Sequence, residues 1–293
     1  MILENCVLPG RQNNLSQHFG TDSPTSCYNK KWFKNYEYNV EYRTNSRGYR
    51  DTEWPNDVNN AIFCIGDSFT YGVGSPVEHT WPYMLEQKTG IRCLNLAING
   101  ASNDLIKRKI HEVRNECKPV AIIACWSYLH RREASDIELL KRINQQWIKF
   151  YNDVKGTDWP ECNNVEQCYT LPEHIQKEVY ETHNFPWWNW LSSCPQKYDD
   201  LAVSHYDGDF ATDDVENFKQ CLSTTDAINL IIPNFCSPDD YETCKSLLQK
   251  YQIYQVNQID MARDYLHWDS KTSKVIVDYL TKKLSKYINE CKN

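Results

Sequence analysis

The sequence predicts a three-layer α/β/α fold built on a mainly parallel sheet of five strands. Short apolar runs end at turn residues, and helical patterns separate one run from the next. An uninterrupted apolar run indicates a strand covered on both faces, and strands that alternate with helices form parallel sheets. The expected strands are 61–65, 91–97, 120–126, 227–232 and 253–256, and the expected helices are 80–88, 102–117, 136–151, 239–251 and 271–288.

The first strand is the run AIFCI at 61–65, which Gly66 ends. The helix expected at 80–88 is followed by Gly90, and glycine is common just past a helix C-terminus. The apolar-rich run 91–97 begins directly after that glycine. Together these residues predict a strand, a covering helix and a second parallel strand.

The next helix and strand repeat this order. In 102–117, apolar residues recur every three or four positions, as they do on the buried face of a helix. Pro119 stops this helix, and 120–126 is wholly apolar, so it predicts a third buried strand. A further helix is expected at 136–151.

The C-terminal part completes the sheet. A strand is expected at 227–232, closed by Pro233, and the turn sequence Ser-Pro-Asp precedes the helix expected at 239–251. After the short strand 253–256, the last helix at 271–288 has an apolar stripe at helical spacing.

Three parts of the chain differ in pattern. Residues 61–151 and 215–293 form the predicted core, and residues 1–60 form an N-terminal extension that packs on it. Residues 152–214 have no clean period and contain the aromatic sequence FPWWNW. A long stretch without structure is unusual inside a compact domain, so 152–214 is predicted to be an inserted subdomain or cap near the active-site edge.

Composition excludes several classes of protein. The 293 residues include 32 Lys and Arg against 39 Asp and Glu, a net charge of −7, which argues against nucleic acid as the main partner. No apolar run approaches the roughly 20 residues of a membrane span. The N-terminus has no basic region, and Glu4 interrupts its apolar stretch, so we expect no signal peptide and a cytoplasmic location.

The thirteen cysteines include no C-x-x-C pair, which removes the main support for a zinc or thioredoxin-like site. Several lie in apolar runs, so we expect reduced, buried thiols. A disulfide between Cys162 and Cys168 stays open if the protein works outside a cell.

The motif GDSFTYG begins at Gly66, where the first buried strand ends. A serine on a tight turn between strand and helix lies where parallel sheets place reactive groups. The motif resembles the first signature block of the SGNH (GDSL) hydrolases. That resemblance implies a flavodoxin-like fold and makes Ser68 the nucleophile.

A member of that family ends with D-x-x-H before its last helix, and Asp264-Tyr265-Leu266-His267 stands in that place. A serine hydroxyl is a poor nucleophile until an imidazole takes its proton, and the imidazole needs an acceptor on its other nitrogen. The resemblance therefore implies that His267 is the general base and that Asp264 orients it.

The oxyanion hole matches the family in part. Ser68 and Gly100 correspond to its backbone N–H donors, Gly100 through the stretch LNLAINGAS at 94–102. The family's G-x-N-D block is absent, because ACWSY stands after the third strand. Ser127 or Asn103 is expected to supply the missing side-chain donor.

Two further stretches bear on the substrate. Arg131 and Arg132 either meet an anionic substrate group or form a solvated face. The sequence RTNSRGYRD at 43–51 resembles the lead-in of polysaccharide O-acetyl esterases and transferases, and its expected role is an added strand and turn beside the sheet. Bacteriophages carry similar chains, so a virion-associated protein is a further hypothesis.

The function expected from these residues is hydrolysis of an ester, with an acyl or acetyl group on a carbohydrate as the favoured substrate. No metal and no organic cofactor is implied. Two alternatives remain: transfer of the acyl group to a sugar hydroxyl by the same triad, and a binding or virion-structural protein with weak catalysis. Association into an oligomer or a virion is left open.

Overall fold

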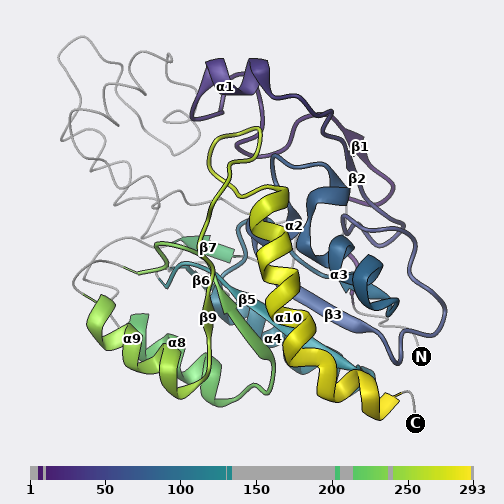
Figure 1. The fold of residues 1–293 in the computed structure, drawn as a ribbon, viewed down its shortest axis with the longest axis vertical. Helices are drawn as coiled ribbons and strands as arrows, with labels where there is room; N and C mark the ends of the chain where they lie inside the picture. The colour runs from purple at the N-terminus through teal and green to yellow at the C-terminus, as the bar shows by residue number, and fades with distance from the viewer. Residues whose placement is uncertain are drawn as a thin grey trace.

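A computed structural model describes residues 6–8, 11–129, 131–133, 202–204, 214–236 and 240–291. The central sheet has five parallel strands in the order β4-β3-β5-β8-β9, which is the doubly wound, flavodoxin-like order. The predicted fold class is confirmed by this sheet and the helices that cover it (Figure 1). The strands are β3 (Ile62–Gly66), β4 (Cys93–Asn95), β5 (Ala121–Trp126), β8 (Ile228–Ile231) and β9 (Tyr254–Gln255).

The covering helices form two groups. Helix α10 packs along α3, whereas α4 contacts α8 and α8 contacts α9. These two groups lie on opposite faces of the sheet (Figure 1). The bounds are α3 (Trp81–Thr89), α4 (Asn103–Glu116), α8 (Asp214–Ser223), α9 (Tyr241–Lys250) and α10 (Ser270–Cys291).

The core lies on both sides of β3 and β5, in which every residue is buried. This burial explains why their sequences are uninterrupted apolar runs. Trp126 at the end of β5 is fully buried and meets Phe218 of α8 edge to face. The sheet therefore provides a rigid base whose carboxyl edge carries the loops of the site.

Small elements precede the sheet. Strands β1 (Leu15–Ser16) and β2 (Tyr42–Arg43) pair antiparallel in a ribbon of their own, and α1 (Lys30–Asn35) lies between them in sequence. After β2, the carboxylate of Asp51 accepts a hydrogen bond from the backbone N–H of Asn95 at 3.0 Å. The lead-in 43–51 thus lies beside the edge strand β4.

Little of the predicted insertion falls within the described residues. Strand β7 (Ala202–Ser204) pairs antiparallel with β6 (Arg131–Glu133). The helix expected at 136–151 and the cap expected at 152–214 otherwise lie outside the described residues, as does the Cys162–Cys168 pair. Helix α8, which the sequence analysis did not predict, begins at the end of this stretch.

Nine cysteines of the described part are free thiols, and eight of these are buried. The buried ones include Cys64, Cys93 and Cys125, which lie in strands of the sheet. Among the helices that the structure describes, none is long and apolar enough to cross a bilayer.

Candidate active site

Strand β3 delivers Ser68 to the carboxyl edge of the sheet. Ser68 is the first residue of the short helix α2 (Ser68–Tyr71), and Asp67 caps it by accepting a hydrogen bond from the N–H of Phe69 at 3.0 Å. Glycine fits two residues before the serine, because a Cβ on Gly66 would lie 2.3 Å from the Thr70 hydroxyl oxygen and 3.0 Å from the carbonyl oxygen of Cys125. Gly72 ends the helix with a φ of 82°, a conformation that favours glycine.

His267 and Asp264 lie on the loop between β9 and α10. The imidazole Nε2 of His267 is 2.8 Å from the Ser68 hydroxyl oxygen, and its Nδ1 is 2.7 Å from Oδ2 of Asp264. The backbone N–H groups of Leu266 and His267 both donate to Oδ1 of Asp264, each at 3.1 Å. The D-x-x-H spacing thus closes a turn on its own aspartate.

All three side chains are buried, with Ser68 and His267 4% exposed and Asp264 not exposed. Burial alone would raise the pKa of Asp264, but the charge of His267 and the hydrogen bonds from His267 and Thr21 outweigh it, so its pKa lies below the ordinary value. An ionised carboxylate only accepts hydrogen bonds, which assigns the proton to Nδ1 of His267. Nε2 is then free to accept from the Ser68 hydroxyl.

The sequence predicts two backbone N–H groups, those of Ser68 and Gly100, as oxyanion donors. The first N–H groups of a helix have no partner within it, and Ser68 opens α2. Gly100 lies after β4 with a φ of 81°, in a segment held beside the serine turn by the hydrogen bond from Ile98 N to Gly66 O at 3.0 Å. The predicted backbone donors Ser68 and Gly100 therefore belong to neighbouring segments.

The expected side-chain donors have other partners, which corrects the sequence prediction. The Ser127 hydroxyl donates to Oδ2 of Asp67 at 2.5 Å. Both ends of the Asn103 amide bond backbone groups: its nitrogen donates to the carbonyls of Ser127 and Tyr128 at 3.3 Å, and its oxygen accepts from Ser127 N at 2.9 Å. Neither side chain is available to an oxyanion in this conformation.

Arg131 is also engaged. Its Nη1 forms an ion pair with Oδ2 of the fully buried Asp67 at 3.0 Å and donates to the Ser127 hydroxyl at 2.9 Å. Its guanidinium lies over the Tyr128 ring, 4.8 Å from the centroid. A buried carboxylate needs such partners, so the main role of Arg131 in this conformation is to pair with Asp67. Arg132 pairs through its backbone with Val203, and its side chain lies outside the described residues.

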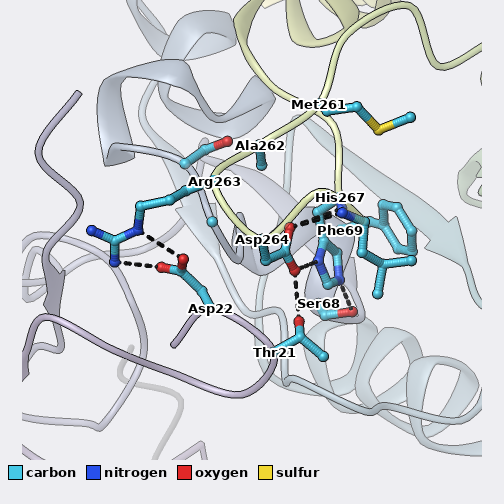
Figure 2. Close-up of polar contacts among 12 residues, drawn as sticks. Thr21, Asp22, Ser68, Phe69, Met261, Ala262, Arg263, Asp264 and His267 are labelled. Carbon is cyan, nitrogen blue, oxygen red and sulfur yellow. Dashed lines mark hydrogen bonds and ion pairs between the residues drawn. The ribbon is translucent and has the colours of Figure 1, made fainter. Parts of the chain in front are cut away.

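The sequence analysis missed residues of the N-terminal extension that reach this site. The hydroxyl of Thr21 donates to Oδ2 of Asp264 at 2.6 Å, and Asp22 forms an ion pair with Arg263 at 2.7 Å (Figure 2). These partners lie more than 240 residues apart in the chain. No local pattern marks Thr21 or Asp22, because neither belongs to a motif.

No protein-family model matches the chain. No curated protein matches it either.

The solved structures to which the chain is similar include lipolytic proteins and esterases. One is a member of the lipolytic protein G-D-S-L family from Veillonella parvula, at 11% identity and a TM-score of 0.34, with 76% of this chain and 96% of that one covered. A second is the psychrotrophic esterase EstA from Pseudoalteromonas sp., at 13% identity and a TM-score of 0.33, with 79% and 100% covered.

A third is a family two carbohydrate esterase from Clostridium thermocellum in complex with cellohexaose, at 10% identity and a TM-score of 0.36, with 81% of this chain and 67% of that one covered. Likenesses of this size establish neither activity nor substrate. The chemistry therefore rests on the side chains of the site itself.

Proposed function

We propose that this chain is a serine esterase of the SGNH type, in which Ser68 is the nucleophile, His267 the general base and acid, and Asp264 the residue that orients His267. One observation carries the proposal: an unbroken hydrogen-bonded chain runs from the Ser68 hydroxyl through both imidazole nitrogens to a buried carboxylate. A hydroxyl with such a partner is the arrangement that activates serine for attack on a carbonyl carbon.

In the first half-reaction, Oγ of Ser68 attacks the ester carbonyl carbon while Nε2 of His267 takes the hydroxyl proton. The carbonyl oxygen becomes an oxyanion, and the backbone N–H groups of Ser68 and Gly100 stabilise it. When the tetrahedral intermediate collapses, the bond to the alcohol oxygen breaks and His267 gives that oxygen its proton. The products are the free alcohol and an acyl group on Ser68.

In the second half-reaction, a water molecule attacks the acyl carbon and His267 takes its proton. Collapse of the second intermediate returns the proton to Oγ of Ser68 and releases the carboxylic acid. Asp264 stays ionised and keeps Nδ1 protonated throughout, which the lowered pKa of its carboxyl supports. No redox step and no co-reactant other than water is needed.

The substrate class proposed is an acyl or acetyl ester of a carbohydrate. The lead-in 43–51, whose sequence resembles that of polysaccharide O-acetyl esterases and transferases, supports it. Acyl transfer to a sugar hydroxyl uses the same first half-reaction and differs only in the acceptor. A binding role on the same fold is favoured by one observation, the engagement of both Ser127 and Asn103 with protein partners.

A fluorophosphonate probe tests the proposal, because it phosphonylates an activated serine whatever the natural ester. We expect stoichiometric labelling of the full chain, located at Ser68 by peptide mass spectrometry, and none in Ser68→Ala. The wild type should also hydrolyse p-nitrophenyl acetate and acetylated oligosaccharides, and Ser68→Ala should not. A folded wild-type chain that neither labels nor hydrolyses any ester would transfer support to the binding role.

A further inference from the structure

Two neighbouring residues of the N-terminal segment, defined here as residues 17–42, pair with two neighbouring residues of the loop 256–269. Thr21 bonds Asp264, and Asp22 bonds Arg263 (Figure 2). The Asp22 pair is two-pronged, with Nε of Arg263 on Oδ1 at 2.8 Å and Nη2 on Oδ2 at 2.7 Å. Two-pronged pairs fix orientation as well as distance.

Within the part of the chain that the structure describes, the carboxylate of Asp264 accepts four hydrogen bonds, and they differ in origin. Three come from Leu266 and His267, within three residues of Asp264 in the chain. The fourth comes from Thr21, at Oδ2, the same oxygen that faces Nδ1 of His267. Thr21 is thus the long-range donor that ties the triad aspartate to another part of the molecule.

The position of Thr21 is itself fixed by buried contacts. Asp22 is fully buried and accepts a hydrogen bond from the Tyr42 hydroxyl at 2.5 Å. That hydroxyl accepts from Gly74 N at 2.8 Å, and Arg263 N donates to Gly74 O at 2.8 Å. These bonds form a closed hydrogen-bond network that joins the N-terminal segment, the loop after α2 and the loop 256–269.

The same segment contacts the loop at two more points. The N–H of Tyr28 donates to the carbonyl of Asp264 at 3.1 Å, and the Trp32 indole donates to the carbonyl of Ala262 at 2.8 Å. The Trp32 ring also meets Tyr265 edge to face, with centroids 5.6 Å apart. The N-terminal segment therefore holds the backbone at Ala262 and Asp264 and packs against the side chain that follows Asp264.

We propose that Thr21 is a positioning residue of the active site: its hydroxyl fixes the carboxylate plane of Asp264 against His267, and the Asp22–Arg263 pair holds Thr21 in place. This inference rests on the proposed function. Removing the hydroxyl leaves Asp264 charged but frees Oδ2 to turn away from Nδ1. Removal of a hydrogen bond to a charged group of this kind should lower the rate roughly 10-fold.

The test compares Thr21→Val, which removes the hydroxyl at nearly constant shape, with Thr21→Ser, which keeps it. Thr25→Val is the matched control, because Thr25 is an exposed residue of the same segment whose hydroxyl, among the described residues, bonds the Ser23 hydroxyl at 3.1 Å and no group of the active site. We expect Thr21→Val to lower kcat roughly 10-fold with KM nearly unchanged. Thr21→Ser should restore most of the rate, and Thr25→Val should match the wild type.

The pH dependence of kcat/KM distinguishes a positioning role of Thr21 from a role in stabilising the fold. Loss of the Thr21 donor removes one of the hydrogen bonds that hold the pKa of Asp264 below its ordinary value, so that pKa should rise. The part of the acid limb of kcat/KM that reflects protonation of Asp264 should therefore move to higher pH in Thr21→Val alone. The NMR resonance of the proton shared by His267 and Asp264 should shift in the same variant, and this readout needs no turnover.

The outcomes are distinct. Unchanged kcat, acid limb and proton resonance in a folded Thr21→Val chain would overturn the inference while leaving the proposed esterase intact. Equal defects in Thr21→Val and Thr21→Ser would also overturn it, because the hydroxyl would then be irrelevant. An inactive wild type would refute the esterase, and the proton resonance would still decide whether Thr21 orders Asp264.

Discussion

The ring of Phe69 packs against the imidazole of His267, with centroids 4.4 Å apart and planes tilted by 54°. Phe69 follows the nucleophile in sequence and is buried, and it also contacts the Trp268 ring at 4.8 Å. The turn that presents Ser68 therefore also braces the base that serves it. Serine and histidine are placed relative to each other by packing as well as by their hydrogen bond.

Because Ser68 and His267 act as one unit, the losses of activity caused by substituting each of them should not add. Ser68→Ala and His267→Ala should each abolish measurable ester turnover, and the double variant should be hardly worse than either alone. Without the base the hydroxyl is barely nucleophilic, and without the hydroxyl the base has nothing to activate. Asp264→Asn should keep the fold and lose roughly 10⁴-fold in kcat, by analogy with the buried aspartate of other triads. Steady-state kinetics on p-nitrophenyl acetate measures all four variants.

Circular dichroism and thermal melting provide the control for these variants. Ser68 opens the short helix α2 and His267 lies on the loop before α10, both at the carboxyl edge of the sheet, so their substitution should leave the secondary structure intact. A Ser68→Ala chain that is folded and as fast as the wild type would remove Ser68 from the mechanism.

The lowered pKa of Asp264 also predicts how the stability of the protein depends on pH. Its pKa in the folded protein lies below the ordinary value of 3.8. The stabilisation that this carboxylate provides is therefore complete above that ordinary value and is lost as the pH falls below it, through the folded-state pKa. Urea unfolding of wild type and Asp264→Asn from pH 7 to pH 3 measures this contribution. The difference in unfolding free energy should be constant above about pH 5 and change only below about pH 4; a change confined to pH 5–7 would contradict it.

The sequence could predict the sheet because β3 and β5 are buried along their whole length, and complete burial leaves an uninterrupted apolar run. Helix α8 was not predicted, although Val215, Phe218 and Leu222 have helical spacing and are buried. It directly follows a stretch without a period, so its start has no local marker. Strands β1 and β2 have two residues each, and such short elements depend on their tertiary contacts.

The residues of the candidate site likewise include some that the sequence could identify and some that it could not. Ser68, Asp264 and His267 could be found because each lies in a motif at the end of a strand or before a helix. Ser127 and Asn103 were assigned by position alone, and a sequence position does not reveal which partner a side chain will take. In the fold, the buried Asp67 carboxylate takes the Ser127 hydroxyl, because a buried charge needs donors.

Arg50 of the lead-in gives a prediction about stability. Its guanidinium is buried, and it donates to the carbonyls of Glu41 and Ser75 at 2.8 and 2.7 Å and also to those of Tyr71 and Gly72. Burial lowers its pKa, and the Tyr42 ring lies 4.4 Å from it. Arg50→Met should cost about 3 kcal/mol or more of unfolding free energy, because it leaves these buried carbonyls without a donor.

Arg50→Lys is the comparison for that variant. Lysine keeps the charge but is a single point donor and does not reproduce the planar fork, so it should recover only part of the loss. Urea denaturation of the three proteins measures the effect. A loss below about 1 kcal/mol in Arg50→Met would mean that water replaces the guanidinium at these carbonyls.

Cys236 should be the most reactive thiol among the nine that the structure describes. A hydrogen bond from Cys244 lowers its pKa, and it is only half-buried, whereas burial raises the pKa of Cys6 to about 12 and also raises that of Cys125. Because the thiolate is the nucleophile, iodoacetamide at pH 7 should modify Cys236 first, as peptide mass spectrometry can follow. Cys244→Ala removes the hydrogen bond and should slow that modification. Labelling of Cys125 at the same rate as Cys236 in the folded chain would contradict the prediction.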